Sequence, residues 1–294
     1  MTTTTTATRD RTFPLHLPLG LILVTVAWTL AWVGSRGWSH YIFFPLWLGY
    51  ILTVDGLTVL RAGTSLLTRD ARRFALLFAF SIPLWWVFEF ANRFLGNWEY
   101  LTPRDYSPLT FFLLASLSFS TVMPALFVTA TFWRTVPPFD RELRWLRIAP
   151  SRAGLMTIGA LGLAMFAGSL IFSDVLFPLV WIGLFLAVDV VNRLSGAVSI
   201  AGQVADRRWD TVVTLFAAGL TCGFFWEMWN SESMPKWVYH VPHVGCFKVF
   251  EMPILGYGGY LPFALEVFAA YHLFHTLLFR RRDTWLTFDA PPEP

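Results

Sequence analysis

The chain has 294 residues, of which 55% are apolar and 14% charged, with a net charge of +3 and a mean hydropathy of +0.54. Soluble domains carry about 25% charged residues, so this composition excludes a soluble globular protein. The apolar residues gather in stretches of about 20, each long enough to cross a hydrocarbon core as a helix, so we expect an integral membrane protein.

The predicted fold is an all-α polytopic membrane protein. Hydropathy and helix-breaking residues together predict eight membrane-spanning helices. These lie at residues 19–35, 41–59, 74–93, 108–133, 153–172, 176–192, 211–230 and 254–279. The longest connections between them have only about 20 residues, which leaves little chain for any soluble domain.

The basic residues predict the orientation in the cell membrane. The termini and the connections after the second, fourth and sixth spans hold 17 of the 22 basic residues, and the other connections hold 5. Because basic residues are retained on the cytoplasmic side, both termini are predicted to be cytoplasmic. Each arginine cluster sits at a helix end, where membrane anchoring explains it, so nucleic-acid binding is not expected.

The chain contains an internal repeat. The segment FPLWLGYILTVD at 44–55 recurs as FPLVWIGLFLAVD at 177–189, and the pattern Glu-x-x-Asn followed by Trp-x-Tyr-x-x-Pro occurs at 89–103 and again at 227–242. Each unit holds four spans, an even number, so the two units are predicted to be parallel repeats about an axis along the membrane normal, with a cleft between them.

This repeat defines the predicted domains. A short polar N-terminal tail at 1–18 precedes a first four-helix repeat at 19–147. A second four-helix repeat occupies 148–280, and a short C-terminal tail follows at 281–294.

The paired Glu-x-x-Asn motifs are the strongest candidates for chemistry. Glu89 and Asn92 share one helix face, as do Glu227 and Asn230, because residues three apart lie close together on a helix. A carboxylate oriented by a carboxamide can act as an acid or base, and Asn92 and Asn230 are assigned to substrate binding. The alternative is that these side chains satisfy backbone groups at the helix ends.

Trp98, Tyr100, Trp237 and Tyr239 lie just beyond these helices. Aromatic residues at this depth commonly form a belt at the membrane interface. The alternative, taken for the site prediction, is that they line a pocket that stacks on an extended apolar ligand or stabilises a carbocation.

The last span carries Glu266 near its middle, and Val128 stands at the corresponding place of the first unit. An ionisable residue at that depth indicates function, so Glu266 is a third candidate acid or base. His272 and His275 follow toward the cytoplasm and are expected at the interface. The matched Asp55 and Asp189 are expected to pair with Arg61 and Arg193.

The outer loop at 234–262 combines prolines and glycines with Glu251, which is assigned to substrate binding. Glycines permit a non-helical backbone at membrane depth only where the protein shields it from lipid. We expect this loop to form a lid or a re-entrant wall.

Neither a cofactor nor a metal is predicted. The two cysteines, Cys222 and Cys246, have no partners at metal-site spacing, and no phosphate-binding loop, dinucleotide fingerprint or nucleophile elbow occurs.

The order of these motifs resembles the lycopene cyclase domain of the small integral-membrane type, which occurs as two tandem copies. Trp226-Glu227 matches its Trp-Asp element, Trp237 and Tyr239 match its Trp-x-aromatic element, and Pro253 matches the proline of its Pro-Leu-Glu-Glu stretch. Both acids of that stretch are missing here, and Glu251 stands two residues before the proline. The resemblance implies a site for a long polyene and proton-initiated chemistry without a redox cofactor.

Three functions follow from these observations. The first is an enzyme, a cofactor-independent cyclase, isomerase or hydratase, that acts on an isoprenoid, carotenoid or other lipid between the two repeats. The second is a proton-coupled transporter of small solutes. The third is a non-catalytic scaffold that packs against another membrane protein, and a homodimer stays open for all three.

Overall fold

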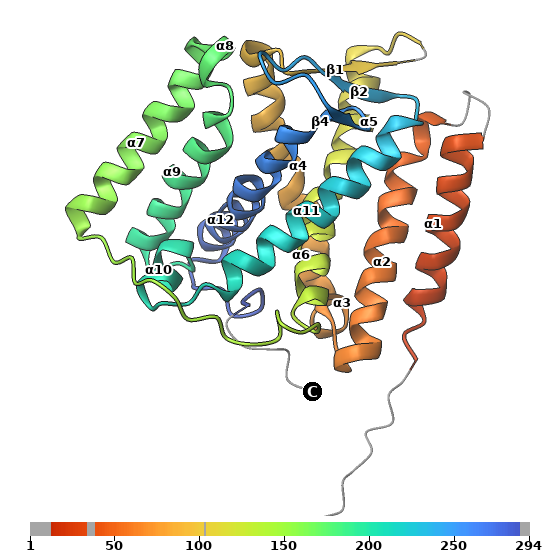
Figure 1. The fold of residues 1–294 in the computed structure, drawn as a ribbon. Helices are drawn as coiled ribbons and strands as arrows, with labels where there is room; N and C mark the ends of the chain where they lie inside the picture. The colour runs from red at the N-terminus through yellow and green to blue at the C-terminus, as the bar shows by residue number, and fades with distance from the viewer. Residues whose placement is uncertain (1–12, 34–38, 103, 289–294) are drawn as a thin grey trace, which may run out of the picture.

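The computed structural model describes residues 13–33, 39–102 and 104–288. Within them the chain is almost entirely helical, with two short two-stranded sheets at the end away from the C-terminus (Figure 1). The α-helices are α1 His16–Val33, α2 Phe43–Ala62, α3 Leu66–Arg69, α4 Ala71–Leu95, α5 Pro108–Phe119, α6 Val122–Trp133, α7 Arg152–Ile171, α8 Ser173–Leu176, α9 Leu179–Ser195, α10 Ile200–Ala205, α11 Asp210–Ser231 and α12 Tyr260–Phe279. The remaining elements are the 3₁₀ helices η1 Ser39–Tyr41 and η2 Ile254–Gly259 and the strands β1 Trp98–Leu101, β2 Lys236–Tyr239, β3 Lys248–Val249 and β4 Met252–Pro253.

Seven helical segments of the described chain are long and apolar enough to cross a membrane. They are α1, α2, α4, α5 with α6, α7, α11 and η2 with α12. This confirms the prediction of a multi-pass helical membrane protein. The predicted span at 176–192 corresponds to α9, whose 17 residues lie at the lower limit for a crossing helix.

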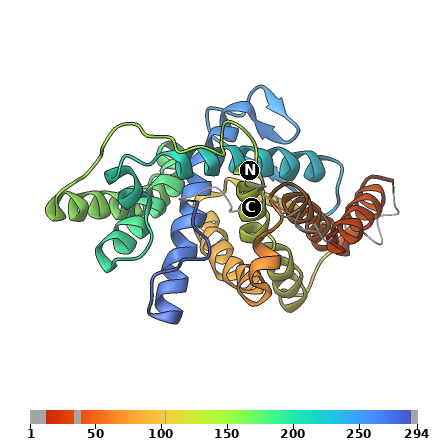
Figure 2. The ribbon, with the colours of Figure 1, turned by 90° about the horizontal axis from the view of Figure 1, so that it is seen from below.

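Two helix pairs form the edges of the molecule. Viewed from the end that bears the C-terminus, α1 and α2 lie at one edge and α7 and α9 at the other (Figure 2). A Cβ atom on Gly49 would lie 2.4 Å from the backbone nitrogen of Val24 in α1, and one on Gly183 would lie 2.6 Å from that of Phe166 in α7. Each pair therefore packs backbone against backbone at a glycine, and these two glycines both stand six residues before the matched aspartates.

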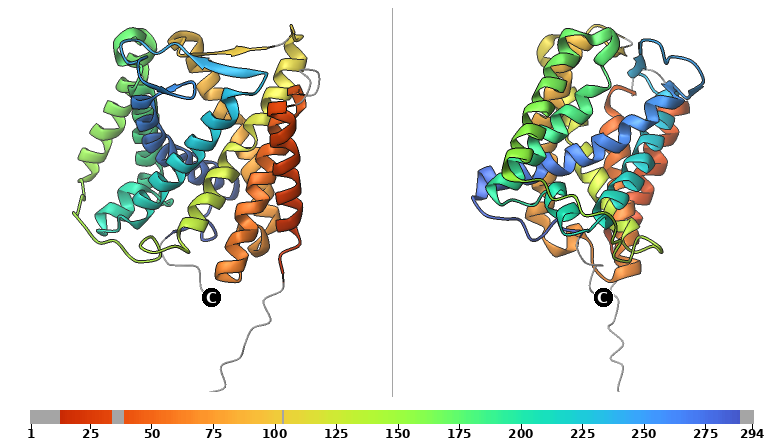
Figure 3. Two further views of the ribbon diagram at one scale, coloured as in Figure 1. Left: turned by 45° about the vertical axis from the view of Figure 1, so that its right-hand side comes forward. Right: turned by 60° about the vertical axis from the view of Figure 1, so that its left-hand side comes forward.

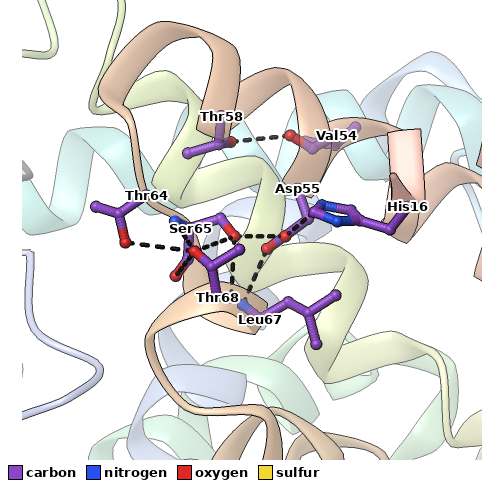
Figure 4. A network of polar contacts seen from close by, with 8 residues as sticks. All are labelled: His16, Val54, Asp55, Thr58, Thr64, Ser65, Leu67 and Thr68. Carbon is purple, nitrogen blue, oxygen red and sulfur yellow. Dashed lines mark hydrogen bonds and ion pairs between the residues drawn. The ribbon is translucent and has the colours of Figure 1, made fainter. Parts of the chain in front are cut away.

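The matched aspartates hold the short helices that follow these pairs. Asp55 accepts hydrogen bonds from Ser65 Oγ (2.6 Å) and the Leu67 N–H (3.2 Å), and it forms an ion pair with His16 (Figure 4). Asp189 accepts the N–H groups of Ile200 (2.7 Å) and Ala201 (2.8 Å) at the start of α10. Free N–H groups at a helix start are natural partners for a carboxylate.

The expected pairing of Asp55 with Arg61 is wrong, because the Arg61 guanidinium donates to Oγ1 and the carbonyl of Thr135 instead. Arg61 is exposed at the end of α2, whereas Asp55 is buried one turn or more before it.

The centre of the molecule is α12, which crosses the bundle obliquely (Figure 3) and packs against α4, α6, α9 and α11. Its residues from Phe263 to His272 are all buried. Beyond its end the chain turns back, and Trp285, Leu286 and Phe288 join the main apolar core. This C-terminal segment therefore closes one end of the bundle.

Candidate functional site

The two Trp-x-Tyr elements meet at one place. β1 and β2 pair antiparallel, with Trp98 opposite Tyr239 and Tyr100 opposite Trp237 (Figure 1). The tryptophan of each element therefore faces the tyrosine of the other, and the two Glu-x-x-Asn helices, α4 and α11, end beside this small sheet. The two sequence motifs, at 89–103 and 227–242, therefore meet at this small sheet.

The two asparagines hold the strands in the same way. Asn92 Nδ2 donates to the Trp98 carbonyl at 2.7 Å, and its Oδ1 accepts the Trp98 N–H at 3.3 Å. Asn230 makes the equivalent bonds to the Trp237 carbonyl (2.7 Å) and N–H (2.8 Å). Both carboxamides thus satisfy backbone groups beyond the helix end, and substrate contact by them stays a prediction.

Glu227 is the most enclosed member of the site. Its side chain is fully buried, and its Oε1 accepts hydrogen bonds from the hydroxyl groups of Tyr239 (2.7 Å) and Tyr260 (2.6 Å). Trp237 Nε1 donates to the Tyr239 hydroxyl at 2.8 Å, so a tryptophan supports one of these two donors. Among the described residues, Oε2 of Glu227 has no hydrogen-bond partner.

Glu89 occupies the equivalent position on α4 and is half-buried. Its Oε1 accepts from the Tyr100 hydroxyl at 2.5 Å and from the indole nitrogens of Trp85 (3.0 Å) and Trp98 (3.2 Å). Each glutamate is therefore bonded by the tyrosine of its own Trp-x-Tyr element. The other partners differ, because Glu89 also accepts from Trp85 and Trp98, whereas Glu227 also accepts from Tyr260 of α12.

The sequence analysis missed Trp85 and Tyr260. Trp85 precedes Glu89 by four residues, so helix periodicity alone places the two side chains on one face. Tyr260 lies 33 residues after Glu227 and reaches it only through the packing of α12 on α11, for which the sequence holds no local signal.

Aromatic rings pack in a row that begins at Tyr260, one of the two residues that donate to Glu227. Trp226 stacks on Tyr260 with ring centroids 5.9 Å apart, and Phe263 lies 6.0 Å from Trp226. Trp181 of α9 continues this set, 5.6 Å from Phe263. The four strand residues Trp98, Tyr100, Trp237 and Tyr239 are buried or half-buried beside the glutamates, so they contribute to the interior of the site.

The hydroxyl groups of the two strand tyrosines, Tyr100 and Tyr239, stay protonated and act as hydrogen-bond donors. Burial raises the pKa of Tyr239 well above its usual value, and the neighbouring Glu227 carboxylate raises it further. Burial and the Glu89 carboxylate raise the pKa of Tyr100 in the same way. Both hydroxyls therefore remain protonated and donate to their glutamates well above neutral pH.

Glu266 lies apart from this site. It stands six residues after Tyr260 on α12, is fully buried, and neither of its oxygens has a hydrogen-bond partner in the described part of the chain. No contact with Glu89 or Glu227 is recorded among those residues. His272 is buried below it, and His275 lies 3.5 Å from Asp283 of the C-terminal segment.

Glu251 ties the outer loop to the sheet. Its Oε1 lies 2.5 Å from Lys236 Nζ on β2, and the same amine donates to the Ser231 carbonyl at the end of α11. The loop consists of β2, the β3–β4 hairpin and η2, and it leads directly into Tyr260. The structure therefore makes Glu251 part of the wall that covers the end of α11.

The Glu227 side chain is enclosed in this conformation. A shallow surface hollow of about 310 Å³ lies elsewhere, between α4 and α12, and neither Glu89 nor Glu227 lines it. No group of three or more metal-ligating side chains is found in residues 13–33, 39–102 and 104–288.

The Glu227 carboxyl group can donate or accept a proton in the buried interior of the protein. One oxygen of Glu227 is fixed by two hydroxyl groups, which leaves the other to face a reacting atom. The carboxyl group is fully buried, which keeps bulk water away from it, and the Tyr260 ring that donates to it stacks on Trp226. No family model, curated protein or solved structure matches the chain.

Proposed function

We propose that this multi-pass membrane protein is an enzyme that acts on an isoprenoid, carotenoid or other apolar lipid by acid–base chemistry, with Glu227 as the group that transfers the proton. The observation that carries the proposal is the Glu227 carboxyl group, which is fully buried, fixed through Oε1 and unpartnered at Oε2 among the described residues.

Stability gives no reason for this arrangement. A buried polar atom without a partner costs about 1–3 kcal/mol, and a carboxylate toward the C-terminal end of a helix opposes the helix dipole. Buried ionisable residues inside membrane proteins are accordingly associated with function. Tyr239 and Tyr260 orient the carboxyl group, and Trp237 orients Tyr239.

The surroundings of Glu227 favour an apolar substrate. Trp226, Phe263 and Trp181 supply ring faces, and a carbocation formed by proton addition to a carbon–carbon double bond is stabilised by such faces. The resemblance to the integral-membrane lycopene cyclase domain supports the same substrate class. The chemistry needs only a proton, which moves from the carboxyl group to carbon and returns from a neighbouring carbon.

The chain is further proposed to be a tandem repeat of two parallel four-helix units. In its favour, each unit has a glycine-packed helix pair, an aspartate that holds a short helix, and an Asn that holds a Trp-x-Tyr strand. Glu89 is then the counterpart of Glu227, and the substrate is bound where the units meet at β1 and β2. Substrate access requires the outer loop to move away from the end of α11.

The proposal is tested by expressing the chain in a bacterial host that accumulates lycopene and profiling its carotenoids and polar lipids by mass spectrometry. A new isoprenoid or lipid species is expected with the wild-type chain, and it is expected to disappear with Glu227→Gln. Glu99→Gln is the matched control, because Glu99 is exposed and its carboxylate contacts His240, which lies just after β2. Unchanged profiles with verified membrane protein, or equal loss in both variants, would refute the proposal.

A second candidate, proton-coupled transport, is supported by Glu266. Its buried and unpartnered carboxyl group in the middle of α12 has the character of a proton-carrying site. Proteoliposomes that contain the chain would then show solute-dependent proton uptake that Glu266→Gln removes, with no new lipid species in the expression host.

A further inference from the structure

An open apolar hollow lies on the outer side of the bundle between α4 and α12. It is a shallow, open depression with a volume of about 310 Å³, and all of its lining residues are apolar. The lining residues are Phe80, Pro83, Phe274, Leu277 and Leu278. α4 and α12 lie side by side there (Figure 2), with the rings of Phe80 and Phe274 5.6 Å apart.

The hollow opens toward the hydrocarbon of the membrane. Leu277 and Leu278 are 67% and 58% exposed, and both α4 and α12 belong to the spans long enough to cross the bilayer. A lipid acyl chain is therefore the molecule that meets this surface.

Positive charge stands at one end of the hollow. Asp283 brings the two helix ends together, because its Oδ1 lies 3.6 Å from Arg73 at the start of α4 and 3.5 Å from His275 near the end of α12. Six arginines and two aspartates lie in these end segments. They are Arg69, Asp70, Arg72, Arg73, Arg280, Arg281, Arg282 and Asp283.

Three of these arginines have side chains that are available to bind a ligand. Arg72, Arg280 and Arg282 are exposed and form no ion pair or side-chain hydrogen bond within the part of the chain that the structure describes. Leu278 lies two residues before Arg280, and Phe80 lies eight residues after Arg72, about 12 Å along the helix, so the hollow begins near these charges. The set has the form of a phosphate site joined to an acyl-chain groove.

We propose that the groove between α4 and α12 binds one anionic phospholipid, with an acyl chain against Phe80, Pro83 and Leu278 and the phosphate among Arg72, Arg280 and Arg282. This site is independent of the Glu227 site. Juxtamembrane arginines attract anionic lipids in general, and the hollow adds a fixed place for the chain.

Native mass spectrometry of the full chain in detergent tests this proposal. Phosphatidylglycerol and phosphatidylcholine with identical acyl chains are titrated separately, and single-lipid adducts are counted. Phosphatidylglycerol is expected to bind more tightly, and removal of each arginine is expected to weaken its binding about fivefold. The variants are Arg280→Gln with Arg282→Gln, which removes charge, and Leu278→Trp, which fills the groove.

Leu161→Trp on α7 is the matched control, because Leu161 is also a lipid-facing leucine, 54% exposed, on a different helix. It is expected to leave phosphatidylglycerol binding unchanged. Three results would each overturn the proposal: no preference for phosphatidylglycerol, full binding by Leu278→Trp, or equal weakening by Leu161→Trp. Displacement of the lipid by inorganic phosphate would indicate a free-anion site, and a two-chain complex without lipid would indicate a protein surface; either result also overturns it.

Discussion

Gly223 and Tyr260 occupy adjoining space between α11 and α12, and a Cβ atom on Gly223 would lie 2.4 Å from Cδ2 of the Tyr260 ring. Gly223 precedes Glu227 by four residues, as Trp85 precedes Glu89. In one half, the tryptophan at this position donates to the glutamate, and in the other, a glycine admits a tyrosine from α12 that does so. The absence of a side chain at Gly223 is thus what brings Tyr260 to Glu227.

Gly223→Ala is therefore expected to displace Tyr260 and break its bond to Glu227. Forcing a methyl group into a packed interior costs about 1–3 kcal/mol, more than the gain in helix propensity from glycine to alanine. The variant should melt at a lower temperature in detergent and lose most of the proposed activity.

Gly168→Ala on α7 is the control, because its Cβ atom would meet only Leu176 Cδ1 at an ordinary 3.5 Å. This change should leave the melting temperature equal or slightly higher. A Gly223→Ala protein with wild-type stability and product yield would contradict the role assigned to Tyr260.

The pKa values of Tyr100 and Tyr239 predict a loss of stability in alkali. Burial and the adjacent glutamates raise both pKa values, so the folded chain keeps these protons above pH 10, where unfolded tyrosines release them. The folded state then binds more protons than the unfolded state, so this stabilisation is complete below about pH 10 and falls as the pH rises further.

Melting temperatures measured between roughly pH 8 and 12 should show this fall, and Tyr239→Phe should reduce its slope. Tyr41→Phe is the matched control, because the Tyr41 ring is exposed. The same slope in the wild type and in Tyr239→Phe would show that the Tyr239 hydroxyl is not held as described.

Much of this architecture could be predicted from the sequence, for a physical reason. Long apolar runs are dictated by the thickness of the membrane, so α1, α2, α4, α7, α11 and α12 were located from composition alone. The motifs around Glu89 and Glu227 were also readable, because they recur at nearly equal spacing.

Contacts between residues far apart in the sequence could not be predicted from the sequence alone. The partner of Asp55 was mispredicted because the nearest arginine in sequence lies on an exposed helix end, while Ser65 and the following short helix offer buried donors. Tyr260 was missed because nothing local in the sequence encodes the packing of α12 on α11. The burial of His272 and His275 depends on a C-terminal segment that the sequence analysis took for a tail.

Asp283 is predicted to fasten that segment. Its carboxylate accepts the N–H groups of Leu286 (2.9 Å) and Trp285 (3.1 Å) and the Tyr271 hydroxyl (3.2 Å). Burial alone would raise the pKa of Asp283, but the two N–H groups, together with the charges of His272 and His275, outweigh it and lower the pKa. The stabilisation is therefore present above the unfolded pKa of about 3.9 and is lost as the pH falls through the lower folded value.

Asp283→Asn should cost about 1–3 kcal/mol at neutral pH, because it weakens these hydrogen bonds in a buried place. Limited proteolysis should then cut after Arg280 to Arg282 faster than in the wild type. The exposed Asp105→Asn is the control and should be neutral. Equal cleavage rates in all three proteins would show that Asp283 does not anchor the segment.

The two cysteines provide a test of orientation, because they differ completely in accessibility. Cys246 is exposed in the outer loop before β3, and Cys222 is buried in α11. The outer loop and the end of α12 lie at opposite ends of the bundle (Figure 3). With cytoplasmic termini, a membrane-impermeant maleimide should label Cys246 in intact cells, and Cys246→Ser should abolish that labelling, since Cys222 reacts only after unfolding.

The opposite end is tested with Thr284→Cys on the Cys246→Ser background, because Thr284 is exposed beside the C-terminus. This cysteine should react only after the membrane is permeabilised. The reverse pattern, with Thr284→Cys labelled in intact cells and Cys246 protected, would place the termini outside. It would also place Glu227, Glu89 and the β1–β2 sheet near the cytoplasmic face, where the proposed substrate and protons would then have to arrive.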